Sequence, residues 1–496
     1  MDNNEHKSLN QIIDFRIKKI DEFKSDDINP YPYKFKKDLN IDFINKNEEK
    51  LNEKNITTAG RIISMRSMGK AAFMNIQDEF DKIQLYIKND TIGISKYNTI
   101  VKKLDIGDIV GIDGKLFRTR TNQLSINVNS LTLLSKNIRP LPNLKEKDDK
   151  AFYAFDDKEN KYRNRHLDLI VNNSSKKIFK MRSEIIFEIR KNLNDQGFME
   201  VETPILQNLH GGASARPFIT HHNSLGQDFY LRIAEELYLK RLIIGGFEKI
   251  YEIGKNFRNE GIDRTHNPEF TMLELYESYA DVNDMMLLCE NLIKSLAAKF
   301  NITNVDFMNQ TIYLNKKFTK VSMNDLMSNE IGCDILSVSD KDLFKICKKH
   351  KLDVDSTFNF GQLFDKLFSS LVEPKLIQPT FVYDYPKSIS PLAKVHRDND
   401  KLAERFELFI AGMEFANAFS ELNDPIDQKK RFQDQLDLHK KGDDEAHQMD
   451  IDFIESMEVG MPPTGGIGIG IDRLIMLLLG IDSIKDIILF PSLKNK

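Results

Sequence analysis

Two stretches of alternating polar and apolar residues flank a polar loop within the segment 248–276, and they carry side chains that could hold a phosphorylated ligand. The alternation predicts two strands of a hairpin, because side chains two positions apart share one strand face. Arg258 lies on a face of the first strand, and Phe270, Glu274 and Tyr276 share a face of the second. The arginine fork fits phosphate or carboxylate, and a flat ring can cover a nucleobase. A carboxylate on that surface suits a cationic substrate group, so the pattern favours a ligand site over an amphipathic hairpin with a solvated face.

A second acidic hairpin is predicted over 404–425, with its turn at Ala411 and Gly412. If the strands pair around that turn, Phe409 faces Glu414, and Glu407 lies diagonally across on the same face. Two carboxylates gathered in this way suit Mg²⁺, which takes one or two of them together with phosphate oxygens. Solvated acids on an edge hairpin explain the pair alone equally well.

A glycine-rich strand is predicted close to the C-terminus, with glycines at 465, 466, 468 and 470. The spacing is not that of a GxGxxG dinucleotide motif. Glycines at alternate positions leave one strand face bare, so that a flat ligand can lie against it. Arg473 then opens an apolar helix, where the helix N-terminus adds a favourable dipole for an anion.

The elements that carry these residues fall into two predicted domains. Five short strands between 58 and 134 predict a small β-barrel of the OB-fold type. Between Arg61 and Arg139 there are 13 Lys and Arg residues against 7 Asp and Glu. Phe73 lies close to Arg66 in sequence, and Gln84 is on the next strand. Aromatic and basic strand residues are how such barrels hold single-stranded bases, although an exposed phenylalanine or a local charge fluctuation alone decides nothing.

Other segments predict supporting structure. An amphipathic helix is expected over 8–24, and a charged, proline-punctuated linker over 138–170. A helix over 174–196, ended by Gly197, leads into a strand. The segment 281–378 has helical patterns without recognisable chemistry and is interpreted as an insertion or cover.

The composition is typical of a soluble globular protein. The 496 residues are 41% hydrophobic and 29% charged, with a net charge of −4. The three cysteines form no CxxC pair, which argues against a disulfide framework or a zinc site and for a reducing compartment. The N-terminus lacks an apolar signal region, and the run 474–481 is far shorter than the ~20 residues of a membrane span. A cytoplasmic location without membrane attachment is therefore expected.

The string FRNEGIDRTHNPEFTMLELY, residues 257–276, resembles motif two of the class II aminoacyl-tRNA synthetases, in the form found in lysyl-tRNA synthetases. Two further blocks of the family resemble the strings ELFIAGMEFANAFSELNDP and PPTGGIGIGIDRL. The second of these strings resembles motif three. The helix and strand of 178–206, with Pro204, resemble motif one, and MGKAAF, IQLYI and GKLFRT resemble the anticodon-binding domain. The similarity covers about Gly60 to Pro491. Glu235 is a departure, since the family commonly has proline there.

The resemblance implies an α+β fold, in which an N-terminal OB-fold β-barrel precedes a class II antiparallel-sheet catalytic domain flanked by helices. The expected segments are an N-terminal helical segment (1–57), the anticodon-binding barrel (58–137), the linker (138–170) and the catalytic domain (171–496). Motif two is expected over 248–276 and motif three over 465–478. A twofold dimer built on motif one is also implied.

The resemblance further implies a lysine–tRNA ligase acting on ATP, L-lysine and tRNA(Lys), with Mg²⁺ as cofactor. Its ATP site would comprise Arg258, Glu260, His266, Asn267, Phe270, Glu407 and Arg473, of which Arg258 and Arg473 are catalytic. Its lysine site would comprise Gly212, Glu236, Arg258, Glu274, Tyr276, Asn417, Phe419 and Glu421. Glu407 and Glu414 would bind the metal, and Arg66, Phe73 and Gln84 the anticodon. Because Glu414 and Asn417 would both face the site, a bulge or the end of the strand is expected between them.

Three alternatives share parts of this pattern. An aspartyl- or asparaginyl-tRNA synthetase has the same architecture, but its substrate pocket requires a cation or amide donors, whereas the pocket predicted here is acidic. A protein-lysylating paralogue lacks the barrel. An inactive tRNA-binding protein would not require Arg258, Glu407, Glu414 and Arg473 together.

Overall fold

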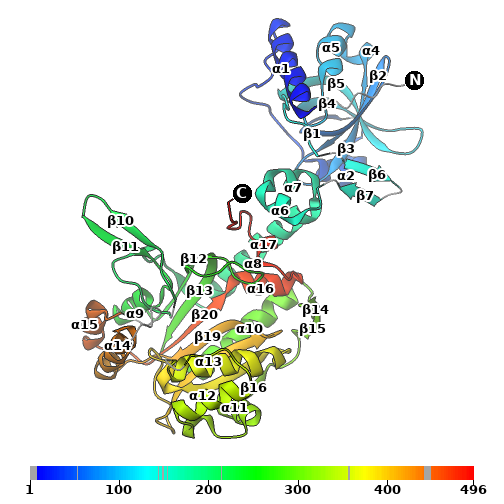
Figure 1. The fold of residues 1–496 in the computed structure, drawn as a ribbon. Helices are drawn as coiled ribbons and strands as arrows, with labels where there is room; N and C mark the ends of the chain where they lie inside the picture. Colours follow the sequence, from blue (N-terminus) through cyan, green and yellow to red (C-terminus); the bar gives the residue numbers. More distant parts are fainter. Residues whose placement is uncertain are drawn as a thin grey trace. The chain divides into compact units, whose positions relative to one another are not determined.

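The computed structural model describes residues 8–495 except 53, 143, 148–149, 154, 214, 356–357 and 441–447, with the backbone alone for 144–147, 150–153 and 438–440. The chain divides into two compact units, Met1–Phe155 and Asp156–Lys496. Figure 1 shows the elements of each unit.

The first unit is a closed five-stranded barrel in the order β1-β2-β3-β5-β4, as the sequence predicts. The strands are β1 (Asn55–Met68), β2 (Ala71–Gln77), β3 (Lys82–Lys88), β4 (Ile109–Arg118) and β5 (Leu124–Ser135). Alternate residues of β2 and β3 point into the apolar barrel core, which leaves their other faces for contacts outside. The N-terminal helix α1 (Leu9–Ser25) begins with a capping box at Ser8 and buries Ile20 and Phe23.

Short helices complete the first unit: α2 (Ile41–Lys46), α3 (Glu48–Leu51), α4 (Asn89–Ile92), α5 (Ile94–Thr99) and the 3-10 turn η1 (Val101–Lys103). The segment predicted as a linker holds more regular structure than its charge suggested. It contains the strands β6 (Leu144–Lys147) and β7 (Lys150–Tyr153), and the helices α6 (Lys158–Arg163) and α7 (Arg165–Val171) of the second unit. Arg165 and Asp168 form a buried ion pair at 2.7 Å, so this part is folded rather than a spacer.

The second unit is organised around an eight-stranded sheet in the order β16-β17-β18-β19-β20-β13-β12-β8. Only the outermost pairs, β16 with β17 and β12 with β8, are parallel. The strands are β8 (Met199–Glu200), β12 (Lys249–Phe257), β13 (Glu269–Ser278), β16 (Thr319–Ser322), β17 (Thr380–Pro386), β18 (Leu402–Ile410), β19 (Met413–Ser420) and β20 (Thr464–Gly470). The expected antiparallel catalytic sheet is thus present.

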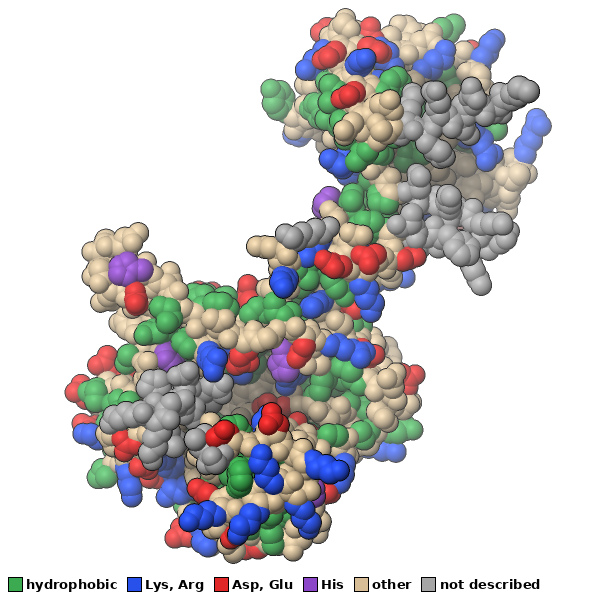
Figure 2. Space-filling model, in the orientation of Figure 1, with side chains coloured by type: hydrophobic (Ala, Val, Ile, Leu, Met, Phe, Trp, Pro, Cys, Tyr) green, Lys and Arg blue, Asp and Glu red, His purple; other side chains and the backbone are tan. Residues whose placement is uncertain are grey.

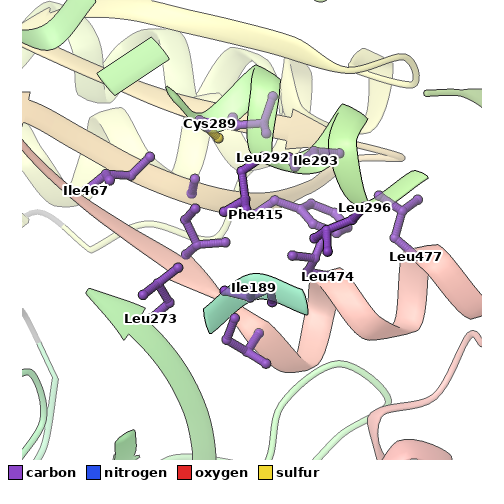
Figure 3. Packing of buried hydrophobic residues seen from close by; sticks show 14 of the residues in the cluster. Ile189, Leu273, Cys289, Leu292, Ile293, Leu296, Phe415, Ile467, Leu474 and Leu477 are labelled. Carbon is purple, nitrogen blue, oxygen red and sulfur yellow. The ribbon is translucent and has the colours of Figure 1, made fainter. Parts of the chain in front are cut away.

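Three helices cover the sheet's apolar face: α8 (Asn173–Asp195), α10 (Val282–Lys299) and α16 (Ile471–Leu479). Figure 3 shows Ile189 of α8, Leu292 of α10 and Leu474 of α16 meeting around Phe415 of β19. The interpretation of 281–378 as insertion or cover is therefore wrong for α10, whose Cys289, Leu292 and Leu296 are core residues.

The remaining elements surround this sheet. Smaller strands are β9 (Leu206–Gln207), β10 (Ile219–His222), β11 (Gln227–Leu231), β14 (Asn304–Phe307) and β15 (Gln310–Tyr313). Further helices are α9 (Glu236–Ile244), α11 (Met323–Ile331), α12 (Asp340–Lys349), α13 (Phe360–Leu371), α14 (Pro425–Lys440), α15 (Ile451–Glu458) and α17 (Ile484–Ile487), with 3-10 turns η2 (Ile335–Ser337), η3 (Glu373–Lys375) and η4 (Lys387–Ile389). Helices α11 to α13 pack around a separate apolar cluster. The hairpin β10–β11 extends away from the sheet (Figure 1).

Both hairpins predicted to carry chemistry form, and the second has the predicted pairing of Phe409 with Glu414. In β12–β13, Asn256 pairs with Phe270 and Ile250 with Tyr276. In β18–β19 the register shifts between Leu408 and Phe409, so that Phe409 opposes Glu414 while Glu407 opposes Asn417. The bulge expected between Glu414 and Asn417 is confirmed.

Candidate active site

The cationic end of the site is formed where the end of β12 meets the start of α16. The guanidinium carbon of Arg258 lies 5.2 Å from the ring centre of Phe270. Its Nε is buried and has no hydrogen-bond partner among the described residues. Arg473, in the first turn of α16, donates to the carbonyl oxygen of Glu414 at 2.5 Å and lies 3.0 Å from Nε2 of His266. Two arginines beside an aromatic ring can hold a nucleotide's phosphates and base.

The loop between β12 and β13 is fastened to the rest of the unit. Arg264 donates to the carboxylate of Asp482 at 2.7 Å, and Asp263 contacts Nδ1 of His266 at 2.8 Å. Asn267 is buried, and both of its amide atoms are engaged, with the carbonyl of Glu269 and the N–H of Ser492. Asn267 therefore supports the loop, while a second amide hydrogen and a second lone pair of its oxygen remain for a ligand. Glu260 is exposed on the same loop.

The acidic pair lies on β18 and β19. Both oxygens of Glu407 accept a hydrogen bond, from Arg405 at 2.5 Å and from the Tyr385 hydroxyl at 2.7 Å. Burial raises the pKa of Glu414, and the nearby charge of Glu407 raises it further, while Arg473, Arg258 and Arg405 lower it. Hydrogen bonds that orient a carboxylate are typical of metal ligands, and a divalent cation would relieve the repulsion between the pair. The donor set fits Mg²⁺ held by two carboxylates and phosphate oxygens. In the described residues no group of three or more His, Cys, Asp or Glu could hold a metal unaided.

A third carboxyl group, absent from the sequence predictions, is influenced by this pair. Glu373 lies in η3, and burial raises its pKa to about 7, with further contributions from Glu407 and Glu414. No pattern around Glu373 signals this position, because the fold alone brings it to the hairpin.

The candidate lysine pocket is lined by buried carboxylates. Glu274 and Tyr276 share a face of β13, and the Tyr276 hydroxyl donates to Oε2 of Glu274 at 3.1 Å. Burial raises the pKa of Glu274 well above its ordinary value, and the charges of Glu235, Glu236 and Glu421 add to the effect. Glu421 follows β19 and is 1% exposed. Figure 2 shows acidic side chains in a recess of this unit.

At Gly466 the glycine strand is occupied by side chains of the protein itself. A Cβ at Gly466 would collide with Oε1 of Glu421 and lie 2.5 Å from the Tyr276 ring. At this position the absent side chain makes room for two side chains of the pocket, not for a flat ligand. Gly212 has a φ of +84° and packs against Glu236 in the same manner, since its Cβ would lie 3.1 Å from that of Glu236.

Two cations of the pocket were not predicted from the sequence. Lys240 of α9 is fully buried and forms ion pairs with Glu236, at 2.5 Å, and with Glu421. Arg405 of β18 donates to Glu407 and, through Nε, to Oδ1 of Asn417 at 3.2 Å. The spacing of Glu236 and Lys240, one helical turn apart among apolar residues, was a usable signal for the first. Nothing in the sequence marked Arg405.

Glu235, where the chain departs from the family's proline, adds another buried acid beside this pocket. It lies 3.3 Å from Arg232 and accepts a hydrogen bond from Asn256 at 2.7 Å. Burial raises its pKa, and the charge of Arg232 opposes that rise. Arg232 also pairs with Glu252, so one guanidinium is shared by two buried carboxyl groups.

The barrel presents an aromatic row on its outer face. Phe73 stacks on Tyr86 with ring centres 4.7 Å apart, and Tyr86 lies 5.7 Å from Phe117. Gln84 accepts a hydrogen bond from the Ser125 hydroxyl at 2.9 Å through its Oε1, which leaves its amide N–H groups as the donors of this face. Arg66 is exposed and paired with Phe73 across β1 and β2. The row suits stacking of single-stranded bases. Tyr86 and Phe117 extend the predicted pair.

Comparison with known proteins agrees with both units. Residues 157–494 match the family described as tRNA synthetases class II (D, K and N), and residues 56–134 match the OB-fold nucleic acid binding domain. The chain is 46% identical over 505 residues to the lysine–tRNA ligases of Listeria monocytogenes and Bacillus cereus, with all of each chain covered. Among the helices of the described residues, none has the length and apolarity required to cross a membrane.

Proposed function

This chain belongs to the class II tRNA synthetases of the D, K and N group, and from that premise we propose that it is a lysine–tRNA ligase. The observation that carries the substrate assignment is the acidic pocket of Glu236, Glu274 and Glu421. Relatives that match the chain from end to end are named lysine–tRNA ligases, which supports the same choice. A pocket for aspartate or asparagine would need a cation or amide donors where these carboxylates lie.

The reaction has two steps. The lysine carboxylate attacks the α-phosphorus of ATP, and pyrophosphate leaves. A terminal ribose hydroxyl of the tRNA then attacks the carbonyl carbon of lysyl-adenylate, and AMP leaves. The protein contributes mainly position and charge.

Each charged part of the reactants has a matching group. Arg258 holds the α-phosphate and the substrate carboxylate, Phe270 stacks on adenine, and Arg473 with His266 meets the γ-phosphate. This division is supported by the contact between Arg258 and Phe270 and by that between Arg473 and His266. Glu260 and Asn267 are the further ATP contacts from the loop. Glu407 and Glu414 would hold Mg²⁺, which neutralises phosphate charge when bound.

The lysine substrate lies between two sets of groups. Glu274, Tyr276 and Glu421 surround its ε-ammonium, with Phe419 along its stem. Gly212 and Glu236 meet the α-ammonium, and Asn417 the carboxylate end. Because Arg405 donates to Oδ1 of Asn417, the amide N–H groups of Asn417 are the atoms left for a substrate oxygen.

The barrel selects the tRNA through Arg66, Phe73 and Gln84, which contact the anticodon.

The protein acts as a cytoplasmic homodimer. Dimerisation through motif one is supported by large apolar side chains that the single chain leaves exposed, among them Phe187 of α8, 64% exposed, and Met199 of β8, 42% exposed. Phe187→Glu should yield a monomer in analytical ultracentrifugation, and an unchanged dimer would contradict this interface.

The decisive experiment is ATP–pyrophosphate exchange with each of the twenty amino acids in turn. We expect exchange with L-lysine and background rates with aspartate and asparagine. Charging of a lysine tRNA transcript then separates a ligase from a protein-lysylating enzyme or an inactive tRNA-binding protein. Exchange driven by another amino acid, or by none, would overturn the assignment.

A further inference from the structure

The candidate lysine pocket already contains a lysine side chain of the protein, that of Lys240. It projects from α9 and is 0% exposed. Its ammonium forms ion pairs with Oε1 of Glu236, at 2.5 Å, and with Oε2 of Glu421. It also lies 5.4 Å from the ring centre of Phe419. One internal cation therefore joins the carboxylates assigned to the two ends of the substrate.

The ion pairs use only one oxygen of each carboxylate. Oε1 of Glu421 is buried without a hydrogen-bond partner among the described residues, and it lies against Gly466 and the Tyr276 ring. A buried, unpartnered carboxylate oxygen is costly unless a cation reaches it. Glu421 can thus hold Lys240 with one oxygen and a second ammonium with the other.

The charges of the pocket match this arrangement. Glu236, Glu274 and Glu421 supply three carboxylates, and Lys240 compensates one of them. The ammonium groups of a bound lysine would bring positive charge to the carboxyl groups that Lys240 leaves uncompensated. Among the described residues no cation of the chain pairs with Glu274. Without Lys240, Glu236 and Glu421 would be adjacent like charges in a buried site, and such pairs take up a proton instead of staying ionised.

Two roles for Lys240 are conceivable, and the contacts separate them. An internal lysine could occupy the pocket only until the substrate displaces it. Displacement would leave a fully buried ammonium without its two carboxylates, and within the described part of the chain these are its only ion-pair partners. The pair with Glu236 is also fixed by the helix, since the residues are one turn apart on α9. Burial lowers the pKa of Lys240, but the charges of Glu236 and Glu421 more than offset this, which keeps the ammonium protonated.

We propose that Lys240 is a permanent counter-ion and positioning residue of the lysine site: it opposes the protonation that burial favours in Glu236 and Glu421, and it aligns them so that each presents one oxygen to an ammonium group of the substrate. This inference rests on the proposed function. It adds a specificity-determining residue to a pocket otherwise described by its acids.

The test is calorimetric titration of L-lysine and of ATP into the wild-type protein, Lys240→Met and Lys240→Arg. We expect Lys240→Met to bind L-lysine at least about a hundredfold more weakly, because two buried carboxylates lose their cation. ATP binding should change less than about twofold, since Lys240 is not among the groups assigned to ATP. Lys240→Arg keeps the charge and should retain much of the affinity. Lys240→Met should also lower the preference for lysine over norleucine, which lacks the ε-ammonium, and a packing defect would not do so.

Unchanged or tighter lysine binding by Lys240→Met would overturn the proposal, and tighter binding would identify Lys240 as a displaced occupant. If Lys240→Met does not fold but Lys240→Met combined with Glu421→Gln does, the charge role is supported, because only the charge balance distinguishes the two. If neither folds, Lys240 acts through packing and the proposal fails. Absence of lysine binding by the wild-type protein would instead refute the proposed function.

Discussion

Replacing Arg258 with alanine should separate catalysis from stability. The Arg258 side chain contacts the Phe270 ring at 5.2 Å, and its Nε has no hydrogen-bond partner among the described residues. The folded protein therefore loses little beyond a cation–π contact, worth ~0.5–2 kcal/mol. In a unit as large as Asp156–Lys496, we expect the melting temperature to fall by only a few degrees.

The catalytic loss should be far larger. In the proposed function Arg258 neutralises the charge that develops on the α-phosphate, and removal of one preorganised donor typically costs about 10²–10³-fold in rate. A two-pronged arginine contact carries more than one donor, so we expect at least about 10³-fold less lysine-dependent pyrophosphate exchange by Arg258→Ala.

Arg258→Lys provides the matched control, because it keeps the positive charge and loses the fork. Its exchange rate should lie between those of Arg258→Ala and the wild-type protein. Circular dichroism and ultracentrifugation would establish that each variant is folded and of unchanged assembly state. A folded Arg258→Ala protein with exchange within about tenfold of wild type would refute the assignment of Arg258 to the reacting phosphate.

Three further perturbations test other parts of the molecule. Phe73→Ala should raise the Michaelis constant for tRNA about 5- to 150-fold, the equivalent of ~1–3 kcal/mol for one stacked base, with pyrophosphate exchange unchanged. Phe43→Ala, at an exposed position on α2, should change neither quantity. Equal Michaelis constants for tRNA in the two variants would remove Phe73 from the tRNA site. Asp472 is buried and pairs with Arg182 at 2.6 Å, so Asp472→Ala should lower the free energy of unfolding by ~3–5 kcal/mol in a urea titration, and an unchanged midpoint would contradict the role of this pair. The pKa of Glu373 in the folded protein is raised to about 7, so protonation of Glu373 stabilises the fold as the pH falls from about 7 towards the pKa of this group in the unfolded chain. Glu373→Gln should therefore melt at a higher temperature than wild type at pH 8 and lose that advantage by pH 5. An equal advantage at both pH values would show that the charge of Glu373 is not responsible.

The alternation of polar and apolar residues made the strands that carry the candidate site residues predictable. Alternation placed Phe270, Glu274 and Tyr276 on one face of β13, and the register confirms it. The barrel was recognisable because five alternating runs are separated by turn residues. The turn at Ala411 and Gly412 also formed as expected, with φ values of 53° and 72°.

Features that depend on distant partners were not predictable. Lys240 and Glu421 are far apart in the chain, and only the packing of α9 near the end of β19 makes them an ion pair. Gly466 was interpreted from its own strand, whereas its neighbours Glu421 and Tyr276 come from two others. The helices α6 and α7 were not predicted because their sequences are rich in charged residues, and a buried ion pair such as that of Arg165 and Asp168 in α7 cannot be distinguished from solvated charges in the sequence.

The bulge in β19 determines which side chains of that strand face the site. Phe415 and Ala416 both enter the core, and this doubling is what returns Asn417 to the face of Glu414. If β19 instead ran with regular alternation through the same residues, every side chain after Phe415 would turn over and the amide of Asn417 would enter the apolar layer. The backbone conformation at Phe415 and Ala416, and not only the identity of the side chains, therefore determines which residues of β19 reach the site.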